Sequence, residues 1–294
     1  MIIVFHNAYL ERWRRRETVV CIFAVLATIT PLAAQTRDGM VKKTDLADAG
    51  FSIILPTDTA FDHELQRLGF DQDEDARLLR PLSVILKNSS HRSIVAFALR
   101  WTLSGPDGRV TTHDQSYIQP SGLLDGARAR REHAEVEHQI RQDGSRFVTV
   151  GGMARSRDEL HALAMSRSSD ASQFSVVAVT IDAAIFDDGE YVGPDDLGMV
   201  ERFKAHVDAE QDLMNEIHSR LASGEALKDI LAAIDQGTAK DSGRIPATSA
   251  EIYTATKRSL LHELITTRDN YGDEMALRTI EYRRYENRPL IKER

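Results

Sequence analysis

Three aspartates at alternate positions, Asp71, Asp73 and Asp75, are the residues whose spacing best suits the binding of a cation. They match the first, third and fifth positions of a calcium-binding loop, where carboxylates converge on one hard ion. Ala76 replaces the glycine that the tight bend of such a loop needs, and Leu82 replaces the bidentate glutamate. These departures favour a solvated acidic loop, and calcium binding by the three aspartates is left open.

A second group of acidic residues lies further along the chain: Asp187, Asp188, Glu190, Asp195 and Asp196. The first two fit a tight turn, because an Asp-Gly pair favours the positive φ that such a turn needs. The last two fit the start of a helix, where the helix dipole stabilises negative charge. Local structure therefore accounts for most of this group without a metal ion.

Two segments begin like the helix motif of zinc proteases, with a histidine followed by a glutamate, at His63 and His262. Neither has a second histidine four residues later, so a zinc ion would find one ligand on that helix face. In a third segment, His133 and Glu137 share a helix face, whereas His138 points away from it. A surface ion pair is the interpretation we favour for the third segment.

The sequence contains no Gly-x-Ser-x-Gly nucleophile elbow, no phosphate-binding loop and no Gly-x-Gly-x-x-Gly fingerprint. Its single cysteine, Cys21, excludes a disulfide framework and a multi-cysteine metal site. We therefore predict no catalytic, cofactor-binding or metal-binding residue, and no cofactor. Serine, histidine and aspartate are plentiful, so a hydrolase whose site is assembled from distant residues is the alternative that we keep.

The chain of 294 residues has a formal net charge of -8, which argues against unaided binding to nucleic acid. Aromatic residues make up 6% of the chain, few for a surface that stacks on sugars or bases. Trp101 falls on the apolar face of a predicted strand, and we expect it in the core. Residues 282–288 interleave basic and aromatic side chains, but nearby glutamates favour a solvated helix face.

The N-terminus is typical of an export signal, with basic residues at 12–16 and an apolar run at 19–29. This run is too short to cross a bilayer, which takes about 20 residues. We predict cleavage near Ala34, which leaves a periplasmic or secreted protein without a stable membrane span. Cleavage also removes Cys21, which suits an oxidising compartment and excludes cysteine catalysis.

Between residues 80 and 193 the apolar pattern has a period of two, typical of strands that cover a core on one side. In a strand predicted at 94–104, one face is apolar: Val95, Phe97, Leu99, Trp101 and Leu103. The Gly-Pro-Asp-Gly turn that follows predicts an antiparallel return strand at 110–118.

Further strands are predicted at 51–55, 82–87, 147–150, 174–186 and 191–192, and connecting helices at 127–141 and 158–167. An Asp-Gly turn joins the last two strands into a second hairpin. Short strands separated by turns favour an antiparallel β-sandwich over a parallel sheet.

After Pro194 the period of the pattern becomes that of a helix. Six apolar residues fall on one helix face: Val200, Phe203, Val207, Met214, Ile217 and Leu221. A second helix ends at Gly237, a third opens at the capping-box pair Thr248 and Glu251, and a last one covers 275–285. We expect a helical unit, or a helical layer on the sandwich, that binds a protein partner or a second copy of the chain.

The strands and turns of 81–108 and 177–195 resemble those of exported bacterial proteins of uncharacterised function. This resemblance implies an immunoglobulin-like or fibronectin-like β-sandwich and carries no catalytic residue. The predicted class is α+β, with a signal peptide at 1–34, an Ig-like antiparallel β-sandwich with helical insertions at 41–193 and an α-helical region at 194–290. The function that fits is an exported, non-enzymatic binding or scaffold protein.

Overall fold

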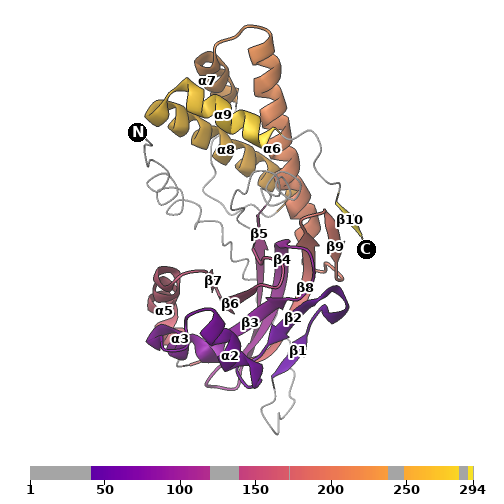
Figure 1. Cartoon of the computed structure of the whole chain (residues 1–294), viewed down its shortest axis with the longest axis vertical. Helices are drawn as coiled ribbons and strands as arrows, with labels where there is room; N and C mark the ends of the chain where they lie inside the picture. Colours follow the sequence, from indigo (N-terminus) through magenta and orange to yellow (C-terminus); the bar gives the residue numbers. More distant parts are fainter. Residues whose placement is uncertain (1–40, 120–138, 172, 238–247, 285–290, 294) are drawn as a thin grey trace.

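The computed structural model of the chain describes residues 41–119, 139–171, 173–237, 248–284 and 291–293. The predicted signal peptide and residues 127–138 of the predicted connecting helix lie outside these ranges. The last part of that helix prediction is wrong, because Ile140 forms an antiparallel bridge with Ile94. Two β-sheets stack in the described part, and long helices follow them along the chain (Figure 1).

Sheet A has the strand order β10–β9–β8–β4–β5, with β1 beside β8. Its strands are β1 (Lys42–Thr44), β4 (Ile94–Ser104), β5 (Val110–Ile118), β8 (Ser175–Phe186), β9 (Glu190–Val192) and β10 (Lys292–Glu293). Both predicted hairpins are confirmed, since β4 pairs antiparallel with β5 and β8 with β9. The expectation of a wholly antiparallel architecture is wrong at two short strands, because β1 pairs parallel with β8 and β10 with β9.

Sheet B has the order β2–β3–β6–β7, and its described pairings are antiparallel. Its strands are β2 (Phe51–Ile54), β3 (Ser83–Asn88), β6 (Ser145–Thr149) and β7 (Gly152–Ala154). Short 3-10 turns, η1 (Ala47–Ala49) and η2 (Arg80–Leu82), lead into β2 and β3. The period-two pattern and the turns thus find the longer strands of both sheets and β9, and miss β1, β7 and β10.

The main apolar core lies between the two sheets. Phe51 of β2 and Phe97 of β4 meet edge to face, with ring centroids 5.7 Å apart. Trp101 is fully buried in the same cluster, as predicted from its place on an apolar strand face. Because alternate residues of a strand point to opposite faces, each sheet contributes every second side chain to this core.

One residue of the predicted apolar face of β4 points the other way. Val95 belongs to a cluster that packs sheet A against the helical region instead of sheet B. The pairing of β4 with β8 shifts by one residue between Ile94 and Ala96, as in a β-bulge. A bulge inserts an extra residue and so changes which face the side chains beside it occupy. The prediction that Val95 shares the face of Phe97 is therefore wrong.

Three helices cover the face of sheet B that points away from sheet A: α2 (Ala60–Arg67), α3 (Glu74–Leu79) and α5 (Arg157–Ala171). Ile85 and Phe147 of the sheet join the apolar side chains of these helices in one cluster. The sequence-based prediction includes α5 but misses α2 and α3, although Phe61 and Leu65 of α2 lie four residues apart on one buried helix face. Sheet B is consequently buried on both faces.

The helical region consists of α6 (Met199–Ala222), α7 (Leu227–Gly237), α8 (Ser249–Tyr271) and α9 (Asp273–Arg283). The first turns of α6 pack on the outer face of sheet A through Val200 and Phe203. The later part of α6 packs against α7, α8 and α9 through Met214 and Ile217. Figure 1 shows α6 running from the sheets to the far end of the helical region. The predicted apolar row of this helix is thus used within the chain itself.

Capping residues explain where two of these helices begin. The side chain of Thr248 accepts from the amide of Glu251 at 3.2 Å, and the Glu251 side chain accepts from the amide of Thr248 at 3.0 Å. This confirms the predicted capping box. Asp195 accepts from the amides of Met199 at 2.7 Å and Val200 at 3.2 Å, as expected for an acidic residue at a helix start.

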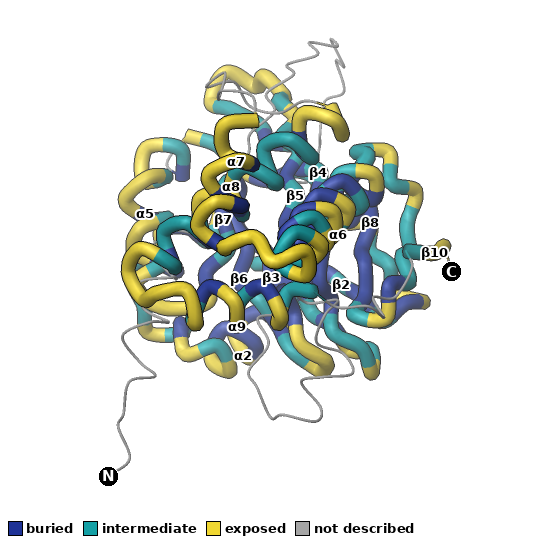
Figure 2. Tube along the Cα trace, turned by 90° about the horizontal axis from the view of Figure 1, so that it is seen from above, coloured by how far each residue is buried: buried dark blue, intermediate teal, exposed yellow. Residues whose placement is uncertain are grey.

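The described structure is mixed α+β, with antiparallel-rich sheets followed mainly by helices. Figure 2 shows that buried residues follow the strands, whereas exposed residues gather on the outer helices. None of the helices in the described ranges has an apolar stretch long enough to span a membrane.

Candidate functional site

β5 lies at one edge of sheet A. It pairs with β4 along nine residues, from Val110 opposite Ser104 to Ile118 opposite Ala96, with no register shift. Among the described strands, none pairs with its other side. The unpaired amide and carbonyl groups along such an edge are a template for another strand.

Two hydrogen bonds fix which residues of β5 point their backbone groups outward. The amide of Gln119 donates to the carbonyl of Val95 at 2.9 Å, and the amide of Gly105 donates to the carbonyl of Arg109 at 2.8 Å. Hydrogen-bonded residues alternate along an antiparallel pair, so the odd-numbered residues of β5 face β4. The outward backbone, which we call the β5 edge, belongs to Val110, Thr112, Asp114, Ser116 and Ile118.

The other edge strands in the described part of the chain are much shorter. β1 and β7 have three residues each, β2 has four and β10 has two, against nine in β5. Proteins usually protect a long edge with lysine, proline or a bulge. β5 contains neither lysine nor proline, and its pairing with β4 has no bulge. In the described ranges, no strand pairs with the β5 edge.

A buried amide network holds the inner face of β5 against sheet B. Gln115 Oε1 accepts from Trp101 Nε1 at 3.1 Å and from the amide of Gly151 at 3.3 Å. Gln115 Nε2 donates to Tyr117 Oη, and the Tyr117 ring stacks on Phe97 with centroids 4.7 Å apart. Gly151 lies in the turn between β6 and β7, so the network joins the two sheets at this edge.

The turn beneath β5 is closely packed against α5. Gly151 has a φ of +99°, and a Cβ at this position would collide with the guanidinium of Arg167. Arg167 pairs with Asp170 of the same helix, with an N–O distance of 3.1 Å. Burial and the charge of Arg167 lower the pKa of His113, which lies on the inner face of β5. The inner face of β5 therefore packs against this turn and α5.

The outer face of sheet A is polar around the middle of β5. Arg100 Nε donates to Asp114 Oδ1 at 2.9 Å, and the two side chains are 41% and 39% exposed. The hydrogen bond with Asp114 raises the pKa of Arg100, and the charges of Asp182 and Asp196 act in the same direction. Arg100 is therefore bonded to one carboxylate, that of Asp114, and is affected by the charges of two further aspartates.

The three aspartates for which calcium binding was left open have local partners. Asp73 caps α3 by accepting from the amide of Asp75 at 3.0 Å. The Asp75 carboxylate contacts His161 Nδ1 at 2.8 Å, and Asp71 accepts from Gln72 at 3.1 Å. In the described ranges, no three His, Cys, Asp or Glu side chains are grouped so as to hold a metal ion. Residues 71–75 were expected to form a solvated acidic loop. Asp73 is instead the N-cap of α3, and Asp75 lies in the first turn of that helix.

A hollow of about 290 Å³ beside α2 and α3 includes Asp71 in its lining. Two arginines, Arg77 and Arg80, also line it. Arg80 donates to Asp62 at 2.6 Å and to the carbonyl of Pro56 at 2.8 Å. These bonds tie Arg80 to the protein itself, and Asp62 also lines the hollow.

The two histidine–glutamate segments fix helices in place. Buried Glu64 accepts hydrogen bonds from three side chains: Arg67, Lys87 and Ser145. Glu263 of α8 accepts from Arg283 of α9 at 2.9 Å, and Arg283 also donates to buried Glu210 of α6 at 2.8 Å. The histidines that precede these glutamates are exposed. His133, Glu137 and His138 lie outside the described residues.

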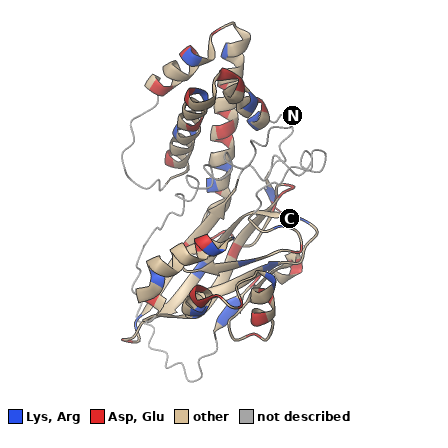
Figure 3. Cartoon of the chain, turned by 60° about the vertical axis from the view of Figure 1, so that its left-hand side comes forward, with Lys and Arg blue, Asp and Glu red and all other residues tan. Residues whose placement is uncertain are grey.

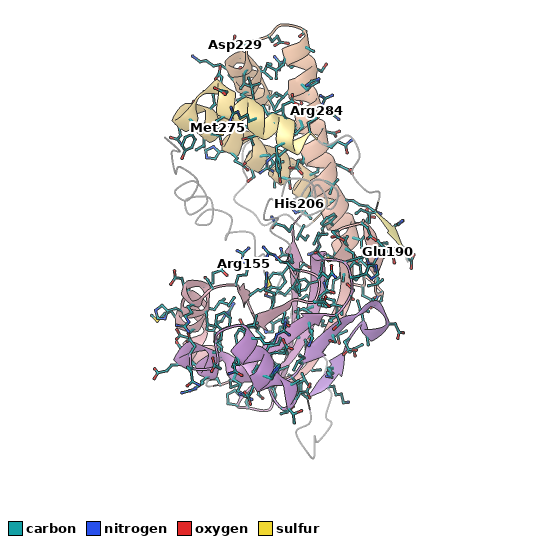
Figure 4. All side chains as sticks on the ribbon, in the orientation of Figure 1. Arg155, Glu190, His206, Asp229, Met275 and Arg284 are labelled. Carbon is teal, nitrogen blue, oxygen red and sulfur yellow. The ribbon has the colours of Figure 1, made fainter. Side chains whose placement is uncertain are left out.

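Polar contacts also join α6 to α8 near the sheets. Three side-chain pairs lie 2.6, 2.7 and 2.8 Å apart: His206–Thr256, Asp212–Tyr253 and Glu216–Lys257. Figure 4 shows His206 on α6 between the sheets and the far helices. Burial lowers the pKa of His206, and the hydrogen bond to Asp212 raises the pKa of Tyr253 to about 12. These groups are used to hold the helices together.

No family model, curated protein or solved structure matches this chain. Function is therefore inferred from the β5 edge itself. The sequence predicts the strand at 110–118 but not its place at an edge, because a period-two pattern carries no information on strand order. The available signal is the polar row of Thr112, Asp114 and Ser116, which is typical of a strand face in contact with solvent.

Proposed function

We propose that this protein is an exported, non-enzymatic interaction protein that binds an extended segment of a partner protein along the β5 edge. The observation that carries the proposal is the outward backbone of five alternate residues on an edge strand of nine residues. In this mode of recognition, main-chain hydrogen bonds supply affinity and side chains at alternate positions supply specificity.

The network around Gln115 supports the proposal because it orders β5 in advance. Trp101, Tyr117 and the turn at Gly151 all bind the Gln115 side chain. A strand that is already ordered loses less conformational entropy when it pairs with a ligand, and the affinity rises accordingly.

Export is supported by the basic and apolar segments before Ala34. We also interpret the stacked sheets as an Ig-like sandwich to which parallel strands and helices have been added. Mass spectrometry of the protein recovered outside the cytoplasm should show a chain that begins near Gln35. Recovery of a chain that begins at Met1 would overturn cleavage of the signal.

The helical region is proposed as a second contact with the same partner. Figure 3 shows acidic and basic residues interspersed along these helices. Three large apolar or aromatic side chains are exposed on α8 and α9: Tyr271, Leu277 and Tyr282. Such mixed surfaces suit a protein partner better than the phosphate backbone of nucleic acid.

The test of the proposed function is strand addition to the exported protein, measured by fluorescence anisotropy. The probe is a labelled nonapeptide with valine at both ends, serine at the centre and threonine elsewhere. Thr112→Pro removes an outward amide and leaves every hydrogen bond to β4 in place, since proline is tolerated on the open side of an edge strand. We expect saturable binding to the wild-type chain and at least about tenfold weaker binding to Thr112→Pro.

Thr112→Val is the matched control, because it keeps the amide and the branched shape of the side chain. Its affinity should stay within about twofold of the wild-type value. Thermal melts of each variant report whether the fold is intact. An absence of saturable binding to the wild-type chain, or equal binding by a folded Thr112→Pro variant, overturns the proposal.

A further inference from the structure

A strand added at the β5 edge places its side chains in a fixed order. Residues directly opposite one another in a sheet point to the same face. The partner residues opposite Val110, Thr112, Asp114, Ser116 and Ile118 would therefore lie on the outer face of sheet A. Because a strand rises about 3.4 Å per residue, the contact spans about 27 Å.

The centre of this row is acidic. Asp114 binds Arg100 mainly through one oxygen, at 2.9 Å, while its second oxygen lies 3.5 Å from the guanidinium. A carboxylate has about four acceptor positions, so a second cation can bind Asp114 from the edge side. The charges of Asp182 and Asp196 act on Arg100 in the same direction as that of Asp114.

Both ends of the row are apolar. Val110 is 52% exposed, a large fraction for a strand valine. Ile118 is half-buried and packs against the cluster that contains Phe203 of α6. An apolar partner side chain at either end would remove apolar surface from water.

A second copy of the chain suits this edge poorly. Antiparallel pairing of two β5 strands over their full length would place Asp114 opposite Asp114 of the other copy, and like charges directly opposite are destabilising. Registers that avoid this contact lose part of the row. A partner with a cationic centre has no such conflict.

We propose that the partner segment carries lysine or arginine opposite Asp114, small β-forming residues beside it and apolar residues opposite Val110 and Ile118. This inference rests on the proposed function and names the chemistry of its partner. The five outward positions thus favour an extended segment that is apolar at both ends and basic in the middle.

The experiment compares three palindromic nonapeptides that differ only at the centre, which is lysine, glutamate or serine. Each has valine ends and threonine between, so the same residues meet Asp114 in a parallel or an antiparallel arrangement. We expect the wild-type protein to bind the lysine peptide about tenfold more tightly than the glutamate peptide. Asp114→Lys should reverse this order, and Asp114→Asn should bind all three within about twofold.

The outcomes separate this inference from the proposed function. Equal binding of the three peptides by the wild-type chain, with binding still lost in Thr112→Pro, overturns the inference and leaves strand addition standing. Binding of none of the peptides overturns both. Sedimentation that shows a dimer abolished by Thr112→Pro identifies a second copy as the occupant and overturns the inference.

A further peptide tests the apolar ends of the segment. Replacing both terminal valines by serine should weaken binding about fivefold or more, and unchanged binding would overturn the inference of apolar residues opposite Val110 and Ile118.

Discussion

Sheet A and sheet B face one another across the same core, but their outer faces differ. The outer face of sheet B carries Ile85 and Phe147 and is covered by α2, α3 and α5. The outer face of sheet A is covered by α6 at one end, over Ala96 and Ala98. Beyond α6 this face carries the half-exposed pair of Arg100 and Asp114.

This difference shows that the residue types on a sheet face depend on whether helices cover that face. Strand β3 is buried on both faces, and its centre is the apolar run Val84, Ile85 and Leu86. Strand β5 has one inner face and one open face, and burial alternates along its second half, where Gln115 and Tyr117 are buried and their neighbours are not. The open part of sheet A is therefore where backbone and polar side chains are available to a partner.

The largest expected effect tests the covered face. Phe147 is fully buried, and its ring lies edge to face with Phe70 at a centroid distance of 6.2 Å. Phe147→Ala should lower the free energy of unfolding by about 3–5 kcal/mol. Thr112→Ala, the matched change on the open face, should lower it by less than about 1 kcal/mol. Urea unfolding measures both, and equal losses would contradict the contrast between the two outer faces.

The sequence was sufficient for the elements that have a strong period. The strands at 94–104 and 110–118, the capping box at Thr248 and the burial of Trp101 all follow from patterning and local chemistry. These features depend on neighbours within a few residues, which a single sequence contains.

The remaining features depend on tertiary contacts. α3 has only six residues, and its packing on sheet B shows why it forms, whereas α2 carries a helical spacing at Phe61 and Leu65 that the sequence-based prediction did not use. The bulge beside Val95 depends on how β4 meets β8. The buried roles of Gln115 and Glu64, and the place of β5 at an edge, likewise depend on strand order, which the pattern does not contain.

The next effect concerns the link between the sheets at the open edge. Gln115→Leu keeps the approximate volume and leaves the donors of Trp101 and Gly151 without their acceptor. Unfolding free energy should fall by about 1–3 kcal/mol, because buried donors lose their partner. Thr111→Val, on the same face of β5, removes one long hydrogen bond of 3.5 Å and should cost less than about 0.5 kcal/mol. If Gln115→Leu were as mild as Thr111→Val, the network would not hold β5 to sheet B.

Acidification should weaken the two sheets in different pH ranges. Burial and the charge of Arg167 lower the pKa of His113 from its ordinary value of 6.5. The unfolded chain therefore binds the proton first, and stability falls as the pH drops below 6.5. Burial alone would raise the pKa of Glu64, but hydrogen bonds from Lys87 and Ser145 lower it below 4.5, so its contribution is lost only below that pH.

Urea unfolding across this pH series separates the two groups. His113→Asn should reduce the loss of stability between pH about 7 and 5, and His206, whose pKa burial also lowers, should contribute to the same loss. Glu64→Gln should change the slope only at lower pH. A His113→Asn slope identical to that of the wild-type chain would show that the open edge has no part in this pH dependence.

The smallest expected effect on stability concerns the residues that matter most to the proposed partner. A double-mutant cycle of Arg100→Ala and Asp114→Ala should give a coupling of about 0.2–1 kcal/mol, because both side chains are partly exposed to solvent. The coupling should shrink at about 1 M salt, where screening acts over about 3 Å. Asp114→Asn should accordingly melt close to the wild-type chain while losing the preference for a cationic peptide. A coupling above about 2 kcal/mol would instead show that the Arg100–Asp114 pair serves mainly to stabilise sheet A. Asp114 would then have little freedom to exchange Arg100 for a cation of the partner.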